Sequence, residues 1–459
     1  MSQVKGLEKT FQEILARREA KSRLRRLTVV PPNSADFSSN SYLSLSTSED
    51  VQREYLQRLQ SEVDAATASS SHGQSASLLG SGGSRLLDGN SSLSESLERE
   101  IAAFHGAKAG LLFSSGFDAN VGLFSSAPQP GDVIVYDELI HASVHDGMKL
   151  SRASKRIPFL HNTAYPRETA GGVQAASSTT NLALSSILDT LVRENEGIRS
   201  GTRNVFIGVE GVYSMDGDVT PLKEIVECVE KLLPKGNGYI IVDEAHSTGI
   251  IGERGRGLVC SLGLEDRVWA RLHTFGKAMS CAGAIVLCSP ATREYLVNYA
   301  RTFIYTTAPP FTTLASIETT YQYLMSGKAE PRLKHLWDIV EQAHTLLLSL
   351  CERYNPDPRI LYVNPRKPES PIIPVLTSRP RSLAKYCQDR GYMIRPIVAP
   401  TVPLGKERVR VCLHAGNTLE EVRGLSEAIG AWLVLEIAKK GGRGNDSAKN
   451  RETTFKPRI

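Results

Sequence analysis

The chain has little cysteine and no long apolar run. Its seven cysteines are scattered over 459 residues and form no C-x-x-C pair, which argues against a zinc ribbon and against a disulfide framework. No run of about 18 apolar residues is present, so we expect no transmembrane helix and no membrane partner. The basic N-terminal stretch has no apolar signal core. We therefore expect a reducing compartment, the cytoplasm.

Several nucleotide and hydrolase motifs are also absent. The sequence contains no G-x-x-x-x-G-K-[ST] loop, no G-x-G-x-x-G after a predicted strand and no G-x-S-x-G elbow, which disfavours an ATPase, a nicotinamide enzyme and a serine hydrolase. No basic stripe with interleaved aromatics occurs, so nucleic acid is not an expected partner.

The formal net charge of +5 comes largely from residues 441–459, which we expect to form a disordered basic tail. The last three residues, Pro457–Ile459, loosely resemble a peroxisomal address, so a peroxisomal location is a weak alternative.

Short apolar runs recur between helical patterns from about Ala109 onward. Strands that alternate with helices are typical of a doubly wound, mainly parallel sheet, whose ligands bind beyond the carboxyl ends of the strands. The runs are Leu111–Phe113, Val133–Tyr136, Val205–Ile207, Tyr239–Val242 and Ala284–Leu287.

Long helices and two short strands after about Pro310 predict a smaller C-terminal α+β domain. We therefore divide the chain into four parts. They are an N-terminal helix and arm (1–45), a large cofactor-binding domain (46–293), the small domain (294–440) and the tail (441–459).

Two short strings point to a cofactor. Asp243, in Val242–His246, ends a predicted strand, and Lys277, in Thr274–Lys277, lies in a loop of small residues. A carboxylate against a pyridine nitrogen keeps that nitrogen protonated, so pyridoxal phosphate can absorb the electron pair left when a bond to an amino acid Cα breaks. The lysine would hold the cofactor as a Schiff base. Each string alone also has an ordinary structural interpretation, but together they favour a pyridoxal phosphate enzyme.

Further candidate residues surround these two strings. Ser114–Asn120 follows a predicted strand and would open a helix whose amides can bind phosphate, although a plain strand-to-helix turn is the alternative. His141 could stack on the pyridine ring, but a lone histidine is more often structural. His246 and Ser214 could bind the cofactor's phenolic oxygen, and spacing alone leaves both assignments open.

At this point the sequence resembles a known family, the α-oxoamine synthases among the fold type I pyridoxal phosphate enzymes. The resemblance extends from the N-terminal helix to about Leu435. The strings that carry it are Asp36–Leu43, Gly80–Arg85, Glu210–Asp218, Val242–His246, Thr274–Lys277, Pro400–Pro403 and Arg408–Arg410.

The resemblance implies pyridoxal 5'-phosphate as the cofactor and a homodimer that shares its active site. Lys277 would be the Schiff-base lysine, Asp243 the pyridine-nitrogen partner and His141 the stacking ring, and these three would be the catalytic residues. Ser214 and His246 would bind the phenolic oxygen. The phosphate ligands would be Gly116, Phe117 and Thr274, with Thr306 or Thr307 reaching the neighbouring subunit's phosphate.

The family also implies an amino acid and an acyl-CoA as substrates. Asn40 and Arg410 would face the amino acid, because the planar fork of arginine pairs with a carboxylate. Arg25, or the nearby Arg23, would meet the distal acyl carboxylate. The freed Lys277, its pKa lowered by burial, would take the Cα proton before the thioester is attacked and CO2 leaves.

The loop Gly80–Arg85 is most like the branch that condenses L-alanine with pimeloyl-CoA in biotin biosynthesis, giving 8-amino-7-oxononanoate, CoA and CO2. The sequence departs from the family at Ser41, Ser44, Ser94 and Ala278–Ser280, where Asp, Gly, His and a Gly-rich turn are usual, and we interpret this as changed specificity. The alternatives are a secondary-metabolism synthase using another acyl thioester, a fold type I aminotransferase and a non-catalytic partner subunit.

Overall fold

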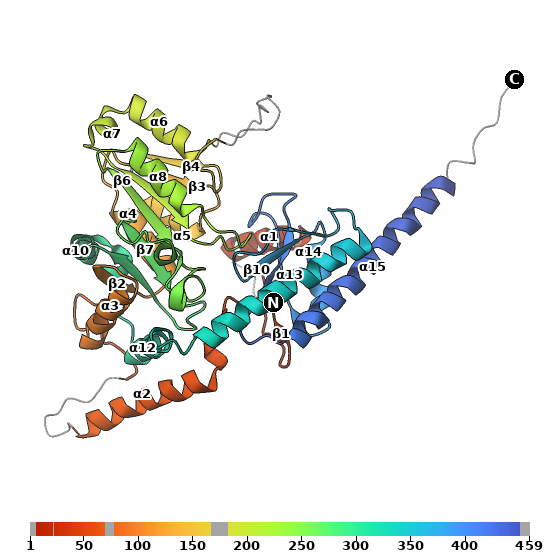
Figure 1. The fold of residues 1–459 in the computed structure, drawn as a ribbon, viewed down its shortest axis with the longest axis horizontal. Coiled ribbons are helices and arrows are strands. Elements are labelled where there is room, and N and C mark those ends of the chain that lie inside the picture. The colour runs from red at the N-terminus through yellow and green to blue at the C-terminus, as the bar shows by residue number, and fades with distance from the viewer. Residues whose placement is uncertain (1–5, 22, 69–77, 167–181, 450–459) are drawn as a thin grey trace.

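A seven-stranded sheet lies at the centre of the larger part of the molecule (Figure 1). The computed structural model describes residues 6–21, 23–68, 78–166 and 182–449. β8 runs antiparallel to both of its neighbours, and the other pairs are parallel. In sheet order the strands are β2 (Ala109–Phe113), β8 (Ala284–Cys288), β7 (Ala270–Thr274), β6 (Gly238–Asp243), β5 (Val205–Glu210), β3 (Val133–Asp137) and β4 (Lys155–Phe159).

The predicted α/β class with a doubly wound, mainly parallel sheet is confirmed, but the direction predicted for Ala284–Leu287 is wrong. This run is β8, which is antiparallel. Only residues 275–283 connect β7 to β8, and a parallel return needs a crossover of a dozen or more residues. The short connection therefore turns the chain back, and Lys277 lies within it.

The sequence pattern does not predict β7, because Arg271 and His273 interrupt its apolar run. Both side chains are buried. Arg271 Nη1 donates a hydrogen bond to the carbonyl of His105 at 2.9 Å, and His273 Nδ1 lies 2.9 Å from Thr248 Oγ1. Buried polar groups are tolerated when they are hydrogen-bonded, so β7 can lie inside the sheet between β8 and β6 despite its polar residues. Only His273 Nε2 is left without a partner among the described residues of this strand.

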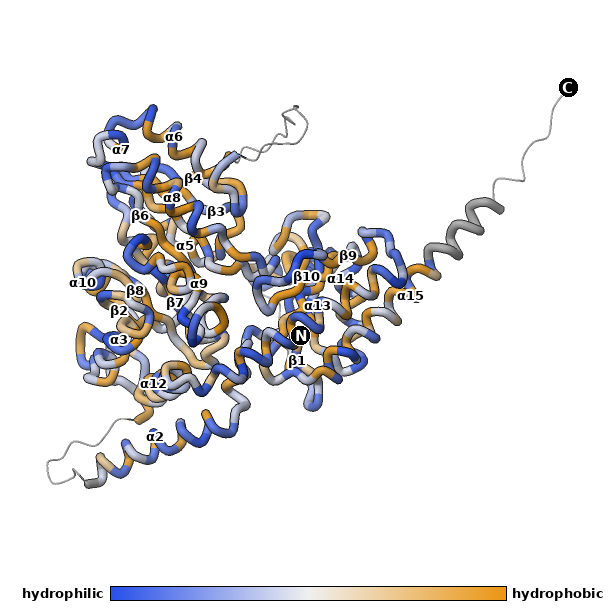
Figure 2. The backbone as a smooth tube through the Cα atoms, viewed as in Figure 1, coloured by the Kyte–Doolittle hydropathy of each residue, from blue (hydrophilic) through white to orange (hydrophobic). Residues whose placement is uncertain are grey.

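Helices cover both faces of this sheet. Consecutive strand residues alternate between two hydrophobic clusters: Val205 and Ile207 face one cluster and Phe206 the other. α6 (Leu184–Glu194) and α8 (Leu222–Leu232) pack on the first face, and α4 (Gly116–Ser126) and α5 (Ala142–Leu150) on the second. In Figure 2 the strands of the large sheet are largely orange, whereas α2 (Glu49–Ala68) is mostly blue.

A four-stranded antiparallel sheet in the order β12-β13-β10-β9 forms a second, smaller unit. α13 (Glu330–Tyr354), α14 (Pro380–Gln388) and α15 (Leu419–Lys449) pack around it (Figure 1). The N-terminal arm joins this unit, because β1 (Ala35–Asp36) pairs with β11 (Tyr392–Met393). The sheet strands are β9 (Tyr362–Val363), β10 (Ile372–Leu376), β12 (Arg395–Ile397) and β13 (Arg408–Cys412).

The remaining elements are shorter segments and helices outside the two sheets. α1 begins at Gly6 and has no buried residue, while α10, α11 and α12 pack against the large unit. None of the helices in the described ranges is long and apolar enough to cross a membrane. These elements are α1 (Gly6–Ala20), η1 (Leu45–Thr47), α3 (Ser92–Phe104), α7 (Glu196–Ser200), η3 (Glu253–Gly255), α9 (Leu258–Ser261), α10 (Pro290–Tyr299), α11 (Arg301–Ile304) and α12 (Phe311–Met325).

The expectation of a disordered tail is wrong for residues 441–449, because α15 continues to Lys449. Helix formation propagates cooperatively from the packed part of α15, and composition alone does not reveal this. Residues 450–459, with the weak peroxisomal address, lie outside the described residues. The four domain boundaries stay predictions.

Candidate active site

The carboxyl ends of β5 and β6 meet at a cavity of about 850 Å³. Seven predicted site residues line it, drawn from the N-terminal arm, the large unit and the small unit. Glu210 and Tyr213 contribute from the end of β5 and the loop after it. The predicted residues are Arg25, Asn40, His141, Ser214, His246, Lys277 and Arg410.

Asp243 ends β6 and is only 6% exposed. Its Oδ2 accepts a hydrogen bond from Asn120 Nδ2 at 2.7 Å, and its Oδ1 accepts one from the amide of Ala245 at 2.9 Å. The Asn120 amide also donates to Ser143 Oγ at 3.0 Å. These donors fix the orientation of a buried carboxylate, which is what a partner for a protonated ring nitrogen requires.

Lys277 lies in the connection between β7 and β8 and lines the cavity. Burial lowers the pKa of its ammonium group, and the carboxylates of Asp243 and Glu210 offset part of this effect. Glu210 shows the opposite shift. Burial, and then the charge of Asp243, raises the pKa of Glu210 well above its usual range. The site therefore favours a neutral Glu210 and a lysine that releases its proton more readily than a free one.

Two histidines of the cavity are held in their uncharged form. Burial, and then the charge of Lys277, lowers the pKa of His246 well below its usual value. Its Nδ1 lies 2.8 Å from the hydroxyl of Tyr42. Burial also lowers the pKa of His141, whose Nδ1 lies 2.7 Å from Ser143 Oγ. Neutral imidazoles can stack on a ring or exchange hydrogen bonds without adding positive charge.

Arg410 enters the cavity from β13 with part of its guanidinium unused. Its Nη2 donates to Asn40 Oδ1 at 3.1 Å and to the carbonyl of Ser38 at 3.3 Å, and its Nη1 donates to the carbonyl of Ser214 at 3.1 Å. Among the described residues, no partner accepts from its buried Nε. Because an arginine fork binds a carboxylate through two nitrogens, this side chain is placed to take one.

The turn before α4 has the shape of an anion cradle. The first-turn amides of a helix lack intrahelical partners and can bind an anion, and Ser115 caps this N-terminus by accepting from the amide of Asp118. A Cβ on Gly116 would lie 3.1 Å from the Cβ of Thr274, so glycine keeps this approach open. Phe117 is 46% exposed beside it. Neither Gly116, Phe117 nor Thr274 lines the main cavity.

Thr306 and Thr307 lie away from this cavity. They follow α11, with Thr307 exposed and Thr306 partly exposed. The next residue, Ala308, donates its amide to the carbonyl of Gly83 at 2.9 Å. This hydrogen bond ties the segment that holds Thr306 and Thr307 to the loop 80–85. These two threonines are the residues predicted to bind the phosphate of the neighbouring subunit. Their role in a homodimer stays a prediction.

Sequence reasoning missed several residues that hold the site together. Tyr42 and Asn120 lie inside strings that were singled out, but nothing in their spacing predicts the contacts with His246 and Asp243. Glu210 opens a string that carries the resemblance, but nothing in its spacing predicts the raised pKa of its side chain. His161 carries no signal in the sequence, because no apolar run predicts the strand before it, β4.

The residues present fit pyridoxal phosphate. A buried carboxylate with fixed donors, a lysine with a lowered pKa, a glycine cradle at a helix N-terminus and an arginine with a free buried nitrogen match the ring nitrogen, the aldehyde, the phosphate and a substrate carboxylate. The fold and this donor set define the class: a fold type I pyridoxal phosphate transferase.

Comparison with known proteins narrows the class. The family model "Aminotransferase class I and II" matches residues 33–429. The 8-amino-7-oxononanoate synthase of Emericella nidulans is 51% identical over 429 residues, which cover 94% of this chain and 96% of the relative. The aminoacyl transferase sphA of Aspergillus fumigatus is 37% identical over 84% of this chain and 78% of its own.

A solved structure of the serine palmitoyltransferase of Sphingomonas wittichii has the same fold, with a TM-score of 0.74 at 24% identity over 93% of this chain and 98% of that one. The chain belongs to the class I and II aminotransferase family and, within it, to the α-oxoamine synthases, which are acyltransferases. Its cofactor is pyridoxal phosphate.

Proposed function

We propose that this protein condenses L-alanine with pimeloyl-CoA, giving 8-amino-7-oxononanoate, CoA and CO2 in biotin biosynthesis. The observation that carries the proposal is the 51% identity with the Emericella nidulans synthase along nearly the whole of both chains. The cavity supports it, because Arg410 and Arg25 line it together with Lys277. L-alanine and pimeloyl-CoA each bring one free carboxylate, so the two substrates together need two such cations.

Different residues of the chain would bind the substrate, transfer the proton and contact the cofactor ring. Arg410 would bind the carboxylate of L-alanine, and Lys277 Nζ would take the proton from Cα. Pyridoxal phosphate supplies the ring that absorbs the electron pair left on Cα. Asp243 would hold a proton on the ring nitrogen, and His246 would donate or accept a hydrogen bond in its neutral form. These roles stay predictions for each residue.

A carbon nucleophile made in this way attacks the thioester carbonyl, so a C–C bond forms and the C–S bond breaks. CoA would leave as the thiolate and take up a proton from solvent. The carboxylate of the alanine part is lost as CO2, and a proton returns to the same carbon. Lys277 Nζ, which would carry the proton taken earlier, would give it back; its position in the cavity wall and its lowered pKa support this role. The protein works as a homodimer in this proposal, with Thr306 or Thr307 serving the neighbouring subunit.

A second candidate is a synthase of secondary metabolism with another acyl thioester, favoured by the 37% identity to the aminoacyl transferase sphA. Ser94, a departure in the acyl-recognition string, is buried in α3, where its amide donates to Ser91 Oγ at 3.1 Å. It does not line the main cavity. The departure at Ser94 therefore does not alter the cavity walls of the same subunit.

Thiol release by purified protein with pyridoxal phosphate tests both candidates. We expect release from pimeloyl-CoA with L-alanine, and not with glycine or L-serine. Lys277→Ala should abolish both the release and the absorbance of the bound cofactor. Release from another acyl-CoA alone would favour the second candidate. A keto acid product without thiol would instead indicate an aminotransferase, and no reaction with an intact cofactor spectrum would contradict the L-alanine and pimeloyl-CoA assignment.

A further inference from the structure

The loop between β5 and α8, residues 211–220, touches both units of the molecule; we call it the connector loop. Gly217 is where it meets the small unit. Ser370 Oγ donates to the carbonyl of Gly217 at 2.7 Å, and a Cβ on Gly217 would lie 2.3 Å from the carbonyl oxygen of Ile372. With φ at +73°, this residue combines a close approach with a left-handed backbone.

Two arginines of β13 donate hydrogen bonds to the connector loop. Arg408 Nη1 donates to the carbonyl of Met215 at 3.0 Å and pairs with the carboxylate of Asp216. Arg410 Nη1 donates to the carbonyl of Ser214 at 3.1 Å. Because Arg410 is also the candidate carboxylate ligand, its position depends on where the connector loop lies.

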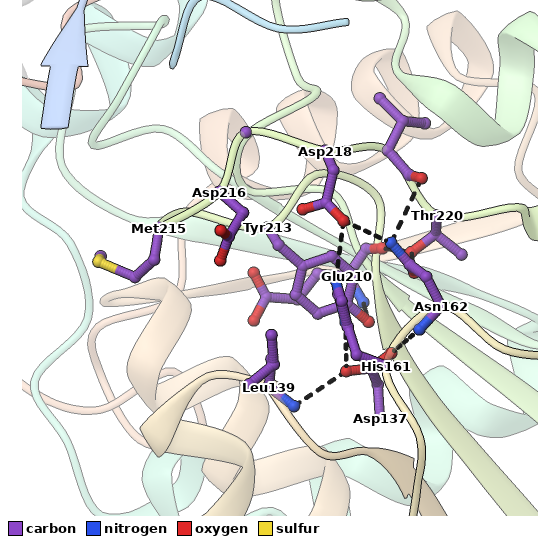
Figure 3. Close-up of polar contacts among 12 residues, drawn as sticks. Asp137, Leu139, His161, Asn162, Glu210, Tyr213, Met215, Asp216, Asp218 and Thr220 are labelled. Atoms are coloured by element: carbon purple, nitrogen blue, oxygen red, sulfur yellow. Dashed lines mark hydrogen bonds and ion pairs between the residues drawn. The ribbon is translucent and has the colours of Figure 1, made fainter. Parts of the chain in front are cut away.

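His161 holds the other side of the connector loop, between two carboxylates (Figure 3). Its Nδ1 lies 2.9 Å from Asp137 Oδ1, and its Nε2 lies 2.8 Å from Asp218 Oδ2. Asp137 ends β3 and is fully buried, whereas Asp218 belongs to the connector loop. Asn162 strengthens the bridge by donating its amide to Asp137 Oδ2 at 2.9 Å and its Nδ2 to Asp218 Oδ2 at 2.8 Å.

Carboxylates only accept hydrogen bonds, so a histidine between two of them donates from both ring nitrogens and carries a positive charge. Burial alone would lower the pKa of His161, but the hydrogen bonds to Asp137 and Asp218 raise it to about 10. Two other titratable groups face this residue. Glu138 Oε1 accepts from the His161 amide at 3.1 Å, and the Tyr213 ring meets the imidazole edge-on at 4.5 Å.

The bridge also reaches the rim of the cavity. Asp137 Oδ1 accepts from the amide of Leu139 at 2.9 Å, and Leu139 lines the cavity two residues before His141. One charged imidazole therefore ties together the end of β3, the cavity rim and the connector loop.

We propose that His161 is a positioning residue for the amino acid. By bridging Asp137 and Asp218, it fixes the connector loop and thereby the places of Ser214 and Arg410 in the cavity. The proposal rests on the proposed function, since it takes Arg410 as the ligand of the amino acid carboxylate. His161 itself does not line the cavity.

Two variants and a matched control test this. Glutamine in His161→Gln cannot donate to two carboxylates on opposite sides, so the bridge opens. Asp218→Asn keeps an oxygen that accepts from Nε2 and should behave nearly as the wild type. The control is His105→Gln, which removes a buried imidazole with partners at 2.9 Å (Arg256 carbonyl) and 3.3 Å (Tyr321 hydroxyl) that lies outside the cavity wall.

The first readout is hydrogen exchange of the amides of residues 211–220 in cofactor-free protein. Tyr213, Gly217 and Thr220 donate their amides within this loop, so exchange reports its order. We expect His161→Gln to speed this exchange at least tenfold. In the holoenzyme, L-alanine affinity from the change in cofactor absorbance should fall at least tenfold. Asp218→Asn should stay within threefold of wild type, and His105→Gln should change neither quantity.

The proposal would be overturned if folded His161→Gln kept the loop exchange rate and the L-alanine affinity of the wild type. It would also be overturned if His161→Gln and His105→Gln lost L-alanine affinity and loop protection to the same extent. If His161→Gln does not fold, Asp218→Ala takes its place, with wild-type exchange again counting against the bridge. If L-alanine causes no absorbance change in the wild-type holoenzyme, the substrate assignment fails. The exchange experiment then still decides whether His161 orders the loop.

Discussion

Ser280 stands in a backbone conformation that favours glycine. Its φ is +54°, it lies three residues after Lys277, and its buried Oγ has no hydrogen-bond partner among the described residues. A left-handed L-residue costs about 1–2 kcal/mol, and a buried unpaired hydroxyl about 1–3 kcal/mol. The extra conformational freedom of glycine in the unfolded chain lowers the free energy of unfolding by about 0.4–1 kcal/mol. We therefore expect Ser280→Gly to raise the free energy of unfolding by about 2 kcal/mol, from these terms taken together.

Ser44 offers a matched control. Its φ is +51°, but its Oγ accepts a hydrogen bond from the amide of Gly416 at 3.0 Å. Ser44→Gly relieves the same backbone strain and loses a hydrogen bond worth about 1 kcal/mol, so its net effect should be close to zero. Neither serine lines the main cavity; the resemblance places Ser44 at a usual glycine and Ser280 within 278–280, where a Gly-rich turn is usual.

Urea unfolding followed by tryptophan fluorescence compares the two variants with wild type at one protein concentration and saturating cofactor. With an unchanged slope, a higher midpoint reports added stability. The strain argument would be refuted by a Ser280→Gly midpoint at or below wild type. An equal gain in Ser44→Gly would show that the unpaired hydroxyl of Ser280 contributes nothing.

Two further outcomes follow from the site and its surroundings. Arg410→Lys should raise the KM for L-alanine about 10- to 100-fold, because a lysine cannot pair bidentately with a carboxylate; a KM within twofold of wild type in steady-state assays would remove Arg410 from the carboxylate site. Burial lowers the pKa of His105 to about 3, below its unfolded value of about 6.5, so this residue's contribution to stability is complete above pH 6.5 and is lost as pH falls toward 3. Urea midpoints between pH 7.5 and 5 should therefore fall more steeply in wild type than in His105→Gln, and parallel slopes would contradict the argument.

The sequence predicts strands where apolar runs are uninterrupted. It does not predict a strand whose buried polar residues are hydrogen-bonded to partners far away in the chain. β5 and β6 are visible as runs, whereas β7 is hidden because Arg271 and His273 find partners that no local pattern reveals. The direction of β8 could have been inferred from the short connection 275–283, which cannot hold a crossover helix.

The site shows the same limit. Residue types and strand ends predict Asp243 and Lys277, since the chemistry needs an acid and an amine at the carboxyl edge of the sheet. The His161 bridge joins residues that are 24 and 57 positions apart in the chain. Such a bridge depends on which loops the strand order of the sheet brings side by side. Strand order cannot be inferred from any single segment of the sequence, so the bridge is not predictable from it.

Sheet register also brings two buried acids side by side at the site. Glu210 and Asp243 are register partners on β5 and β6, so their side chains lie on the same face and compete for one negative charge. Asp243 receives two donors, from Asn120 and the Ala245 amide. Burial and the Asp243 charge then raise the pKa of Glu210, which favours its neutral form.

A single negative charge of fixed orientation is what a protonated pyridine nitrogen needs. Two ionised carboxylates would instead hold the proton on Lys277, because each raises the pKa of that lysine. In the proposed mechanism a neutral Glu210 would leave Asp243 as the partner of the ring nitrogen, and it would allow burial to lower the pKa of Lys277.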